Sequence, residues 1–178
     1  MNSNQQLRRR GFLTAAAGTA AAGQGSAPAG KFALAVGCDH AGFPLKGSVI
    51  ALLKSWGHTV TDCGTYSEAP VDFPDIAQKV CGEVLGGKAQ RGILVCGTGV
   101  GACIAGNKVK GIRAALCHDT YSAHQCVEHD DVNLLCMGAW IIGPKVAEEV
   151  LHAYLGARFS TDEDFRRRVK KLSDMEKR

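Results

Sequence analysis

The stretch "RGILVCGTGVGACIAGN", residues 91–107, joins an apolar run to a glycine-rich loop. The run "ILVC" is apolar throughout, which is typical of a strand buried on both faces of a parallel sheet. Gly97, Gly99 and Gly101 follow it and predict a tight turn in which the backbone approaches another group closely. The next helix begins inside this turn. Cys96 is therefore expected at the end of a strand, at the mouth of whatever binds there.

The same alternation of strand and helix extends over the rest of the chain. Strand-like runs cover residues 31–38, 58–64, 91–96, 112–117 and 132–138; helix-like segments cover 43–57, 72–85, 121–128 and 144–156, with a further helix starting in the glycine loop and a charged one from about residue 162. Apolar strands that alternate with helices predict an α/β fold, an open doubly wound (Rossmann-like) sheet of about five parallel strands with helices on both faces. In such sheets, ligands bind outside the carboxyl ends of the strands.

Composition bounds the class of protein. The chain has 178 residues, 46% of them hydrophobic and 21% charged, which fits one soluble globular domain. The net charge of +4 comes largely from the arginines at 8–10 and the basic run at 166–171. Neither run is interleaved with aromatic residues, so we expect no nucleic-acid partner. No long apolar run lies beyond the N-terminus, so we expect no membrane span in the mature chain.

The N-terminal segment "RRRGFLTAAAGTAAAGQGSAPAG", residues 8–30, differs from the rest of the chain. It joins adjacent arginines to a mildly apolar Ala/Gly run and a small-residue cleavage site, and it resembles a twin-arginine export signal. We therefore expect residues 1–30 to be an export signal, residues 31–178 to form the functional domain, and the mature protein to be periplasmic or otherwise exported. The alternative is a disordered extension on a cytoplasmic protein.

Eight cysteines would usually suggest disulfides in an exported protein. Here they lie in strand-like or helix-like contexts, so most are expected to be small buried hydrophobic residues. No two have the spacing of a CxxC motif, and we expect neither a metal site nor a cofactor.

The glycine loop predicts an anion site. Its amides, with the start of the next helix, can hold a phosphate or an oxyanion, and they would favour the thiolate form of Cys96. The alternative is an inert cysteine beside a common type of strand-to-helix turn. "GTGVG" does not match the dinucleotide fingerprint, and the loop carries no Walker lysine.

Several motifs occur together in order. "GCDHAGFPLK", "VDFPDIA", "ILVCGTGVGACIAGNKVKGIRAALCHDTYSA", "EHDDVNLLCMGAWIIG" and "YLGARF" closely resemble the type B ribose-5-phosphate isomerases and the related galactose-6-phosphate isomerase subunits. The resemblance runs from about residue 31 to the C-terminus. It implies an aldose–ketose isomerase that works through an enediolate without a cofactor, on a sugar or sugar phosphate. It also implies a homodimer or tetramer with its sites between subunits.

The resemblance also implies roles for individual residues. Cys96 matches the carbon base, and His129 matches the ring-opening histidine. The oxyanion and sugar-binding loop would comprise Thr98 and the amides of Gly97, Gly99, Val100 and Gly101, with Asn107 as a neighbour. The contacts to sugar hydroxyls and phosphate would comprise Asp39, His40, Tyr66 and Arg168. Without the resemblance, Asp39 could merely cap a helix and His129 could be a solvated turn residue.

Two positions depart from the family pattern. Trp140 stands where an arginine usually follows the last strand, and Asp164 stands where the C-terminal helix usually carries the first of two arginines. Arginine is the favoured bidentate partner of phosphate. These departures leave two alternatives open: an exported family member that isomerises a non-phosphorylated or different sugar, with Trp140 stacking on the ring, and a catalytically silent sugar-binding protein.

Overall fold

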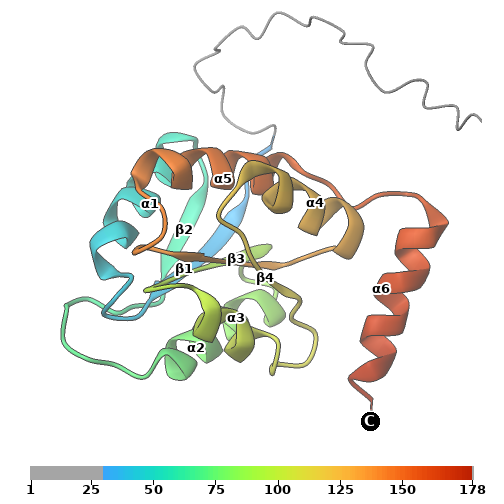
Figure 1. Cartoon of the computed structure of the whole chain (residues 1–178), viewed down its shortest axis with the longest axis horizontal. Coiled ribbons are helices and arrows are strands. Elements are labelled where there is room, and N and C mark those ends of the chain that lie inside the picture. Colours follow the sequence, from blue (N-terminus) through green and yellow to red (C-terminus); the bar gives the residue numbers. More distant parts are fainter. Residues whose placement is uncertain (1–29, 178) are drawn as a thin grey trace, which may run out of the picture.

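The computed structural model describes residues 30–177, so the predicted export signal lies outside the described residues apart from Gly30. Five parallel strands form one sheet in the order β2-β1-β3-β5-β4 (Figure 1). They are β1 (Ala33–Cys38), β2 (Thr59–Asp62), β3 (Arg91–Cys96), β4 (Ala114–Leu116) and β5 (Leu134–Gly138). The prediction of five parallel strands is confirmed.

Helices cover both faces of the sheet, as predicted. One face carries α1 (Phe43–Ser55), α4 (Thr120–Asp130) and α5 (Pro144–Gly156), and the other carries α2 (Phe73–Leu85) and α3 (Val100–Gly106) (Figure 1). This distribution follows from right-handed crossovers, because a connection that runs one way along the sheet places its helix on the opposite face from one that runs the other way.

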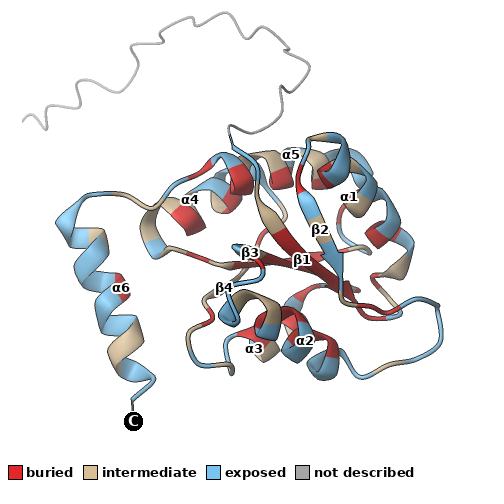
Figure 2. Cartoon of the chain, turned by 180° about the vertical axis from the view of Figure 1, so that it is seen from behind, coloured by how far each residue is buried: buried red, intermediate tan, exposed pale blue. Residues whose placement is uncertain are grey.

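The sheet has a separate hydrophobic core on each face, which explains why its inner strands are apolar at successive positions. Along β1, Leu34 and Val36 pack into the core beneath α1, α4 and α5, whereas Ala35 packs into the core beneath α2 and α3. Successive side chains of a strand point to opposite faces, so a strand covered on both faces must be apolar at every position. Figure 2 shows β1 largely buried inside the domain, whereas the edge strand β2 and the outer helix surfaces are largely exposed.

The strand order places β1 and β3 side by side with their following helices on opposite faces. Cys38 at the end of β1 pairs with Val95 of β3, so the next residues, Asp39 and Cys96, also lie opposite each other. This is the crevice at which doubly wound sheets bind ligands.

The last helix, α6 (Glu163–Met175), extends from the side of the domain next to α4 (Figure 1). Val169 is its one buried residue, and Leu172 and Met175 are exposed. Among residues 30–177, no helix is both long enough and apolar enough to cross a membrane.

Candidate active site

Cys96 and Asp39 meet at the crevice between β1 and β3. The Cys96 thiol donates a hydrogen bond to Asp39 Oδ2 at 2.8 Å, and the other carboxylate oxygen, Oδ1, accepts one from the amide of Gly42 at 2.8 Å. Asp39 is 6% exposed. The carboxylate therefore anchors the start of α1, close to the capping role considered from the sequence, and it also orients the thiol, a role that the sequence did not suggest.

The glycine loop packs tightly around the sulfur. Gly99 has φ +80°, and a Cβ atom there would lie 2.5 Å from Leu116 Cδ1. A Cβ atom at Gly138 would lie 2.7 Å from the backbone of Thr98. These contacts require glycine and hold the loop against the end of β5, with the Gly97 and Gly99 amides at the Cys96 sulfur.

The protonation of Cys96 differs from the sequence-based expectation. Burial raises the pKa of the Cys96 thiol, and so do its hydrogen bond to Asp39 and the charge of that carboxylate. The Gly99 and Gly97 amides lower the pKa, as the loop predicts, but they do not outweigh the other effects. In the unliganded protein, Cys96 is held as the thiol, with its proton directed at Asp39.

Three further predicted residues lie at the strand ends that border this crevice. His40 is exposed, and its Nδ1 accepts a hydrogen bond from the amide of Val71 at 3.3 Å. Tyr66 is 72% exposed and donates its hydroxyl to the Asp62 carbonyl at 3.0 Å. Thr98 is exposed in the glycine loop. Their exposed side chains remain accessible to a ligand.

Lys46 supports this rim, and the sequence did not single it out. Its ammonium group is buried, lies 2.8 Å from both oxygens of Asp62, and donates to the Thr65 carbonyl at 2.7 Å. It also lies 4.7 Å from the centre of the Tyr66 ring. The sequence did contain a signal for this role. Lys46 lies with Leu45 and Val49 on the buried face of α1, and a buried lysine needs a hydrogen-bonding or acidic partner.

Trp140 packs directly on the glycine loop. Its amide donates to the Gly97 carbonyl at 3.0 Å, and a Cβ atom at Gly97 would lie 2.8 Å from the indole ring. The side chain is nevertheless 72% exposed. Trp140 thus presents one uncovered aromatic surface next to Cys96, at the position where the family resemblance leads us to expect an arginine.

His118 is half-buried just after β4, although its sequence position suggests a surface residue. Its Nε2 accepts a hydrogen bond from the Gly138 amide at 2.9 Å, and burial lowers its pKa. The imidazole thereby ties the end of β4 to the end of β5. The expectation that most cysteines are small buried residues is confirmed at the other strand ends, because Cys38, Cys117 and Cys136 are each at most 1% exposed.

The remaining predicted residues do not join this group within one chain. His129 and Asn107 lie at the C-terminal ends of α4 and α3, and helices that return between parallel strands run antiparallel to them. Both residues therefore lie at the amino-terminal edge of the sheet, away from Cys96. Asn107 bonds the backbone of Cys103 and of Ala114, which ties α3 to β4.

His129 and Arg168 instead form a second group with α6. The His129 ring stacks on Phe165, with 3.9 Å between ring centroids and 12° between planes. The Arg168 guanidinium lies over the Phe165 ring, 5.4 Å from its centroid, and its Nη2 atom lies 3.7 Å from Asp164 Oδ2. Asp164 also pairs with Arg167 at 2.6 Å, which lowers its pKa and compensates the negative charge.

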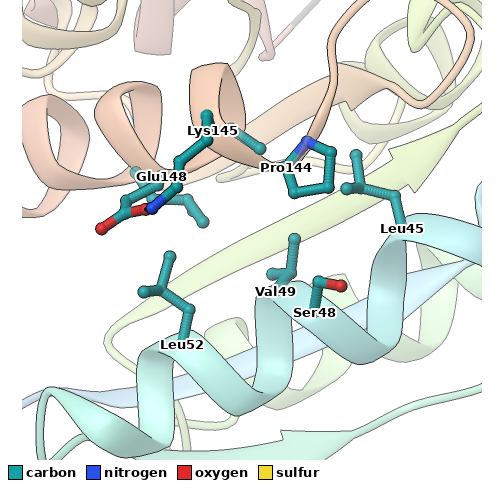
Figure 3. Close-up of a pocket in the computed structure, with 9 residues that line it drawn as sticks. Leu45, Ser48, Val49, Leu52, Pro144, Lys145 and Glu148 are labelled. Atoms are coloured by element: carbon teal, nitrogen blue, oxygen red, sulfur yellow. The ribbon is translucent and has the colours of Figure 1, made fainter.

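Two cavities lie elsewhere. Figure 3 shows an apolar groove between α1 and α5 that is lined by residues such as Leu45, Val49, Leu52 and Pro144. A second cavity lies between β4, α4 and α6. Within residues 30–177 there is no cluster of three His, Cys, Asp or Glu side chains arranged to hold a metal ion.

Known proteins resemble the chain over nearly their whole length. Ribose-5-phosphate isomerase B of Escherichia coli is 41% identical over 145 residues, which cover 82% of this chain and 97% of that protein. D-erythrulose-4-phosphate isomerase of Pectobacterium atrosepticum is 45% identical over 130 residues, covering 71% and 84%. The solved structure of Clostridium thermocellum ribose-5-phosphate isomerase B aligns with a TM-score of 0.79 at 40% identity, covering 82% of this chain and 97% of that chain.

The family model described as Ribose/Galactose Isomerase matches residues 34–172, which include all of the sheet except Ala33 and most of α6. Fold, sequence identity and this match agree, and the chain belongs to the ribose/galactose isomerase family.

Proposed function

We propose that the protein is a cofactor-independent aldose–ketose isomerase that interconverts sugar phosphates through an enediolate, with Cys96 as the carbon base. The isomerase class rests on the family. The observation that carries the assignment of Cys96 is its contact with Asp39 inside a loop of amides.

The chemistry needs a base at carbon and stabilisation of the oxyanion that develops beside it. The thiol must lose its proton before it can accept one from C2, and Asp39 Oδ2 is the acceptor already in place at 2.8 Å. A substrate hydroxyl that bonds the Asp39 carboxylate would weaken its effect on the thiol pKa. The loop amides would then stabilise first the thiolate and later the enediolate oxygen.

We further propose that two copies of the chain complete each site. His129 and Arg168 lie at the opposite edge of the sheet from Cys96, so a single chain supplies two separate half-sites. A two-fold related copy would place the ring-opening His129 and the cationic α6 of one subunit against the Cys96 crevice of the other.

Proton exchange at C2 in deuterated water, over a panel of aldoses and aldose phosphates, tests the reaction without a coupling enzyme. Replacing Cys96 by Ala should lower exchange by roughly 10²- to 10⁴-fold, the usual contribution of a general base. Cys96→Ser should be nearly as inactive, because a hydroxyl is much harder to ionise. Cys63→Ala, which alters a partly exposed thiol just after β2 that forms no hydrogen bond with Asp39, is the matched control. Wild-type exchange by Cys96→Ala would refute the assignment.

A second candidate substrate class is favoured by Trp140. The indole covers Gly97 beside the thiol and supplies no charge for a phosphate. One relative, 40% identical over 126 residues, is named 4-deoxy-4-sulfo-D-erythrose isomerase. The sugar in that name carries a sulfonate group and no phosphate ester. A free sugar could stack on the exposed indole face, and a sugar with a different anionic group could use the α6 arginines alone.

The double variant Trp140→Arg with Asp164→Arg separates these classes. If phosphate binding lacks two cationic contacts, each restored contact contributes about 1.5 to 3 kcal/mol. Turnover of ribose 5-phosphate should then rise at least about tenfold more than turnover of free ribose. An unmodified protein that already turns over ribose 5-phosphate with a submillimolar Michaelis constant would instead exclude the free-sugar class.

We also infer export from residues 1–30. Two adjacent arginines followed by an apolar run and a small-residue site are features of a twin-arginine signal. Lysine at both Arg9 and Arg10 should retain the chain in the cytoplasm, and a full-length, unprocessed chain in the cytoplasm of its native host would contradict export.

A further inference from the structure

Cys117 and Cys126 form a contacting pair of thiols away from Cys96. Cys117 follows β4, Cys126 lies in α4, and their Sγ atoms are 3.9 Å apart. This distance is a van der Waals contact, whereas a disulfide requires about 2.05 Å. Both cysteines are free thiols. Side-chain rotation within the same packing would have to close the remaining gap.

The pair is not sealed inside the protein. Cys126 lines the cavity between β4, α4 and α6, together with residues such as Ala115, Asp130 and Leu172. Cys126 is 8% exposed, and Cys117 lies behind it with 1% exposed. A small reagent in this cavity can therefore reach Cys126 first and Cys117 through it.

The electrostatics of the pair favour the second step of a thiol–disulfide exchange, the attack by Cys117. The hydrogen bond with Cys117 and burial raise the pKa of Cys126, so Cys126 reacts first because it is accessible and not because it ionises readily. The hydrogen bond between the two thiols lowers the pKa of the Cys117 thiol despite its burial. The more deeply buried sulfur is thus the better thiolate, which is the property required of a thiol that attacks a disulfide formed on its neighbour.

The segment between the two cysteines also borders the candidate active site. It contains His118, which accepts from the Gly138 amide at 2.9 Å, and Asp119, which caps α4 by accepting from the Ser122 amide at 2.8 Å. A bond between Cys117 and Cys126 would close this ten-residue loop, residues 117–126, and join β4 covalently to α4.

The geometry points to an oxidisable dithiol, in which Cys117 and Cys126 form an intramolecular disulfide by exchange with a small disulfide such as oxidised glutathione. Cys126 attacks the external disulfide, releases one reduced thiol and becomes a mixed disulfide. The Cys117 thiolate then attacks the Cys126 sulfur and expels the second reduced thiol. In total the pair loses two electrons and two protons, and one external disulfide is reduced to two thiols.

Peptide mapping of the full chain tests this directly. The protein is incubated with oxidised glutathione, its free thiols are blocked with N-ethylmaleimide in denaturant, and it is digested with trypsin and with a protease that cleaves before aspartate. Cleavage after Arg113 and before Asp119 and Asp130 yields peptides 114–118 and 119–129, which contain Cys117 and Cys126 as their only cysteines. We expect these two peptides to be linked and to be two hydrogens lighter than their sum.

The linked protein should also melt at a temperature higher by about 5 to 10 °C, because the bond restrains a ten-residue loop in the unfolded chain. Cys126→Ser should lose both the link and the shift, whereas Cys63→Ser should keep both. The peptide map of the wild-type protein tests the proposal even if a variant fails to fold. Three results would each overturn it: both peptides fully modified by N-ethylmaleimide, Cys126 left as a glutathione adduct, or links to other cysteines.

Discussion

The two edges of the sheet hold different groups of the residues that match the family site. The carboxyl edge brings Asp39, Cys96 and the glycine loop together around a 2.8 Å thiol–carboxylate contact. The opposite edge holds His129 stacked on Phe165, next to the arginines of α6. The first group comes from residues that follow neighbouring strands, and the second from the ends of helices that run the other way.

This difference shows that residues that match a single site of the family can lie far apart within one chain. Strand ends converge because parallel strands share an edge, whereas the C-terminal ends of return helices converge at the opposite edge. A carboxyl-edge residue and a helix-end residue can therefore act on one substrate only when a second copy brings its opposite edge into contact.

The largest effect is expected from mixing two inactive variants. Cys96→Ala removes the proposed base of one half-site, and His129→Ala removes the proposed ring-opening group of the other. If chains exchange freely as dimers, half of the dimers are mixed, and each has one intact site. The mixture should thus regain about a quarter of the wild-type C2 exchange with ribose 5-phosphate. Each variant alone should be roughly 10²-fold or more below wild type.

A substrate that cannot form a ring is the control for His129. A four-carbon aldose phosphate with its 4-hydroxyl esterified stays open, so His129→Ala should retain most of its exchange with that substrate while Cys96→Ala should not. Mixed dimers that form without any gain of activity toward ribose 5-phosphate would contradict a site shared between chains.

A smaller effect is expected from a methyl group at the carboxyl edge. A Cβ atom at Gly42 would lie 2.1 Å from the Val95 carbonyl oxygen, so Gly42→Ala must separate the start of α1 from the end of β3. We expect a loss of about 1 to 3 kcal/mol in the free energy of unfolding, measured by urea denaturation. Isomerase activity should also fall, because the Gly42 amide bonds Asp39.

Gly47→Ala in the same helix is the matched control. Nothing lies within 4 Å of a Cβ atom there, so the substitution should stabilise by about 0.5 to 1 kcal/mol through helix propensity. Equal effects of the two substitutions would show that close packing at the carboxyl edge is not what requires glycine.

The smallest effect is expected from pH at the amino-terminal edge. His58 lies just before β2, its Nδ1 accepts from the Phe32 amide at 3.1 Å, and its buried Nε2 has no hydrogen-bond partner. Burial lowers its pKa in the folded protein. The unfolded chain therefore binds the proton more tightly, so stability is complete above the unfolded pKa of about 6.5 and falls as the pH drops below it.

Urea unfolding of wild type and of His58→Asn at about pH 7.5 and 5.5 measures this effect. The variant should lose less stability over that range, although it should still lose some because burial also lowers the pKa of His118. A variant as sensitive as wild type would assign the pH dependence to other groups.

The local elements could be predicted from the sequence because their causes are local. The strand over residues 91–96 and the helix over residues 144–156 have their predicted bounds. Apolar runs indicate the extent of each element, and Pro144 and the glycines mark where it begins or ends. The burial of Cys38, Cys117 and Cys136 could be predicted for the same reason. The candidate residues Asp39 and Cys96 could be selected because each directly follows an apolar strand.

The tertiary structure alone decided which of these elements are neighbours. The order β2-β1-β3-β5-β4 places β5 between β3 and β4, which no local pattern states, because strand pairing depends on contacts between distant segments. That order makes Asp39 the partner of the Cys96 thiol and reverses its expected protonation. It also leaves His129 at the opposite edge. The amino-acid sequence determined the elements and the chemistry that each one carries, and long-range packing determined which side chains meet.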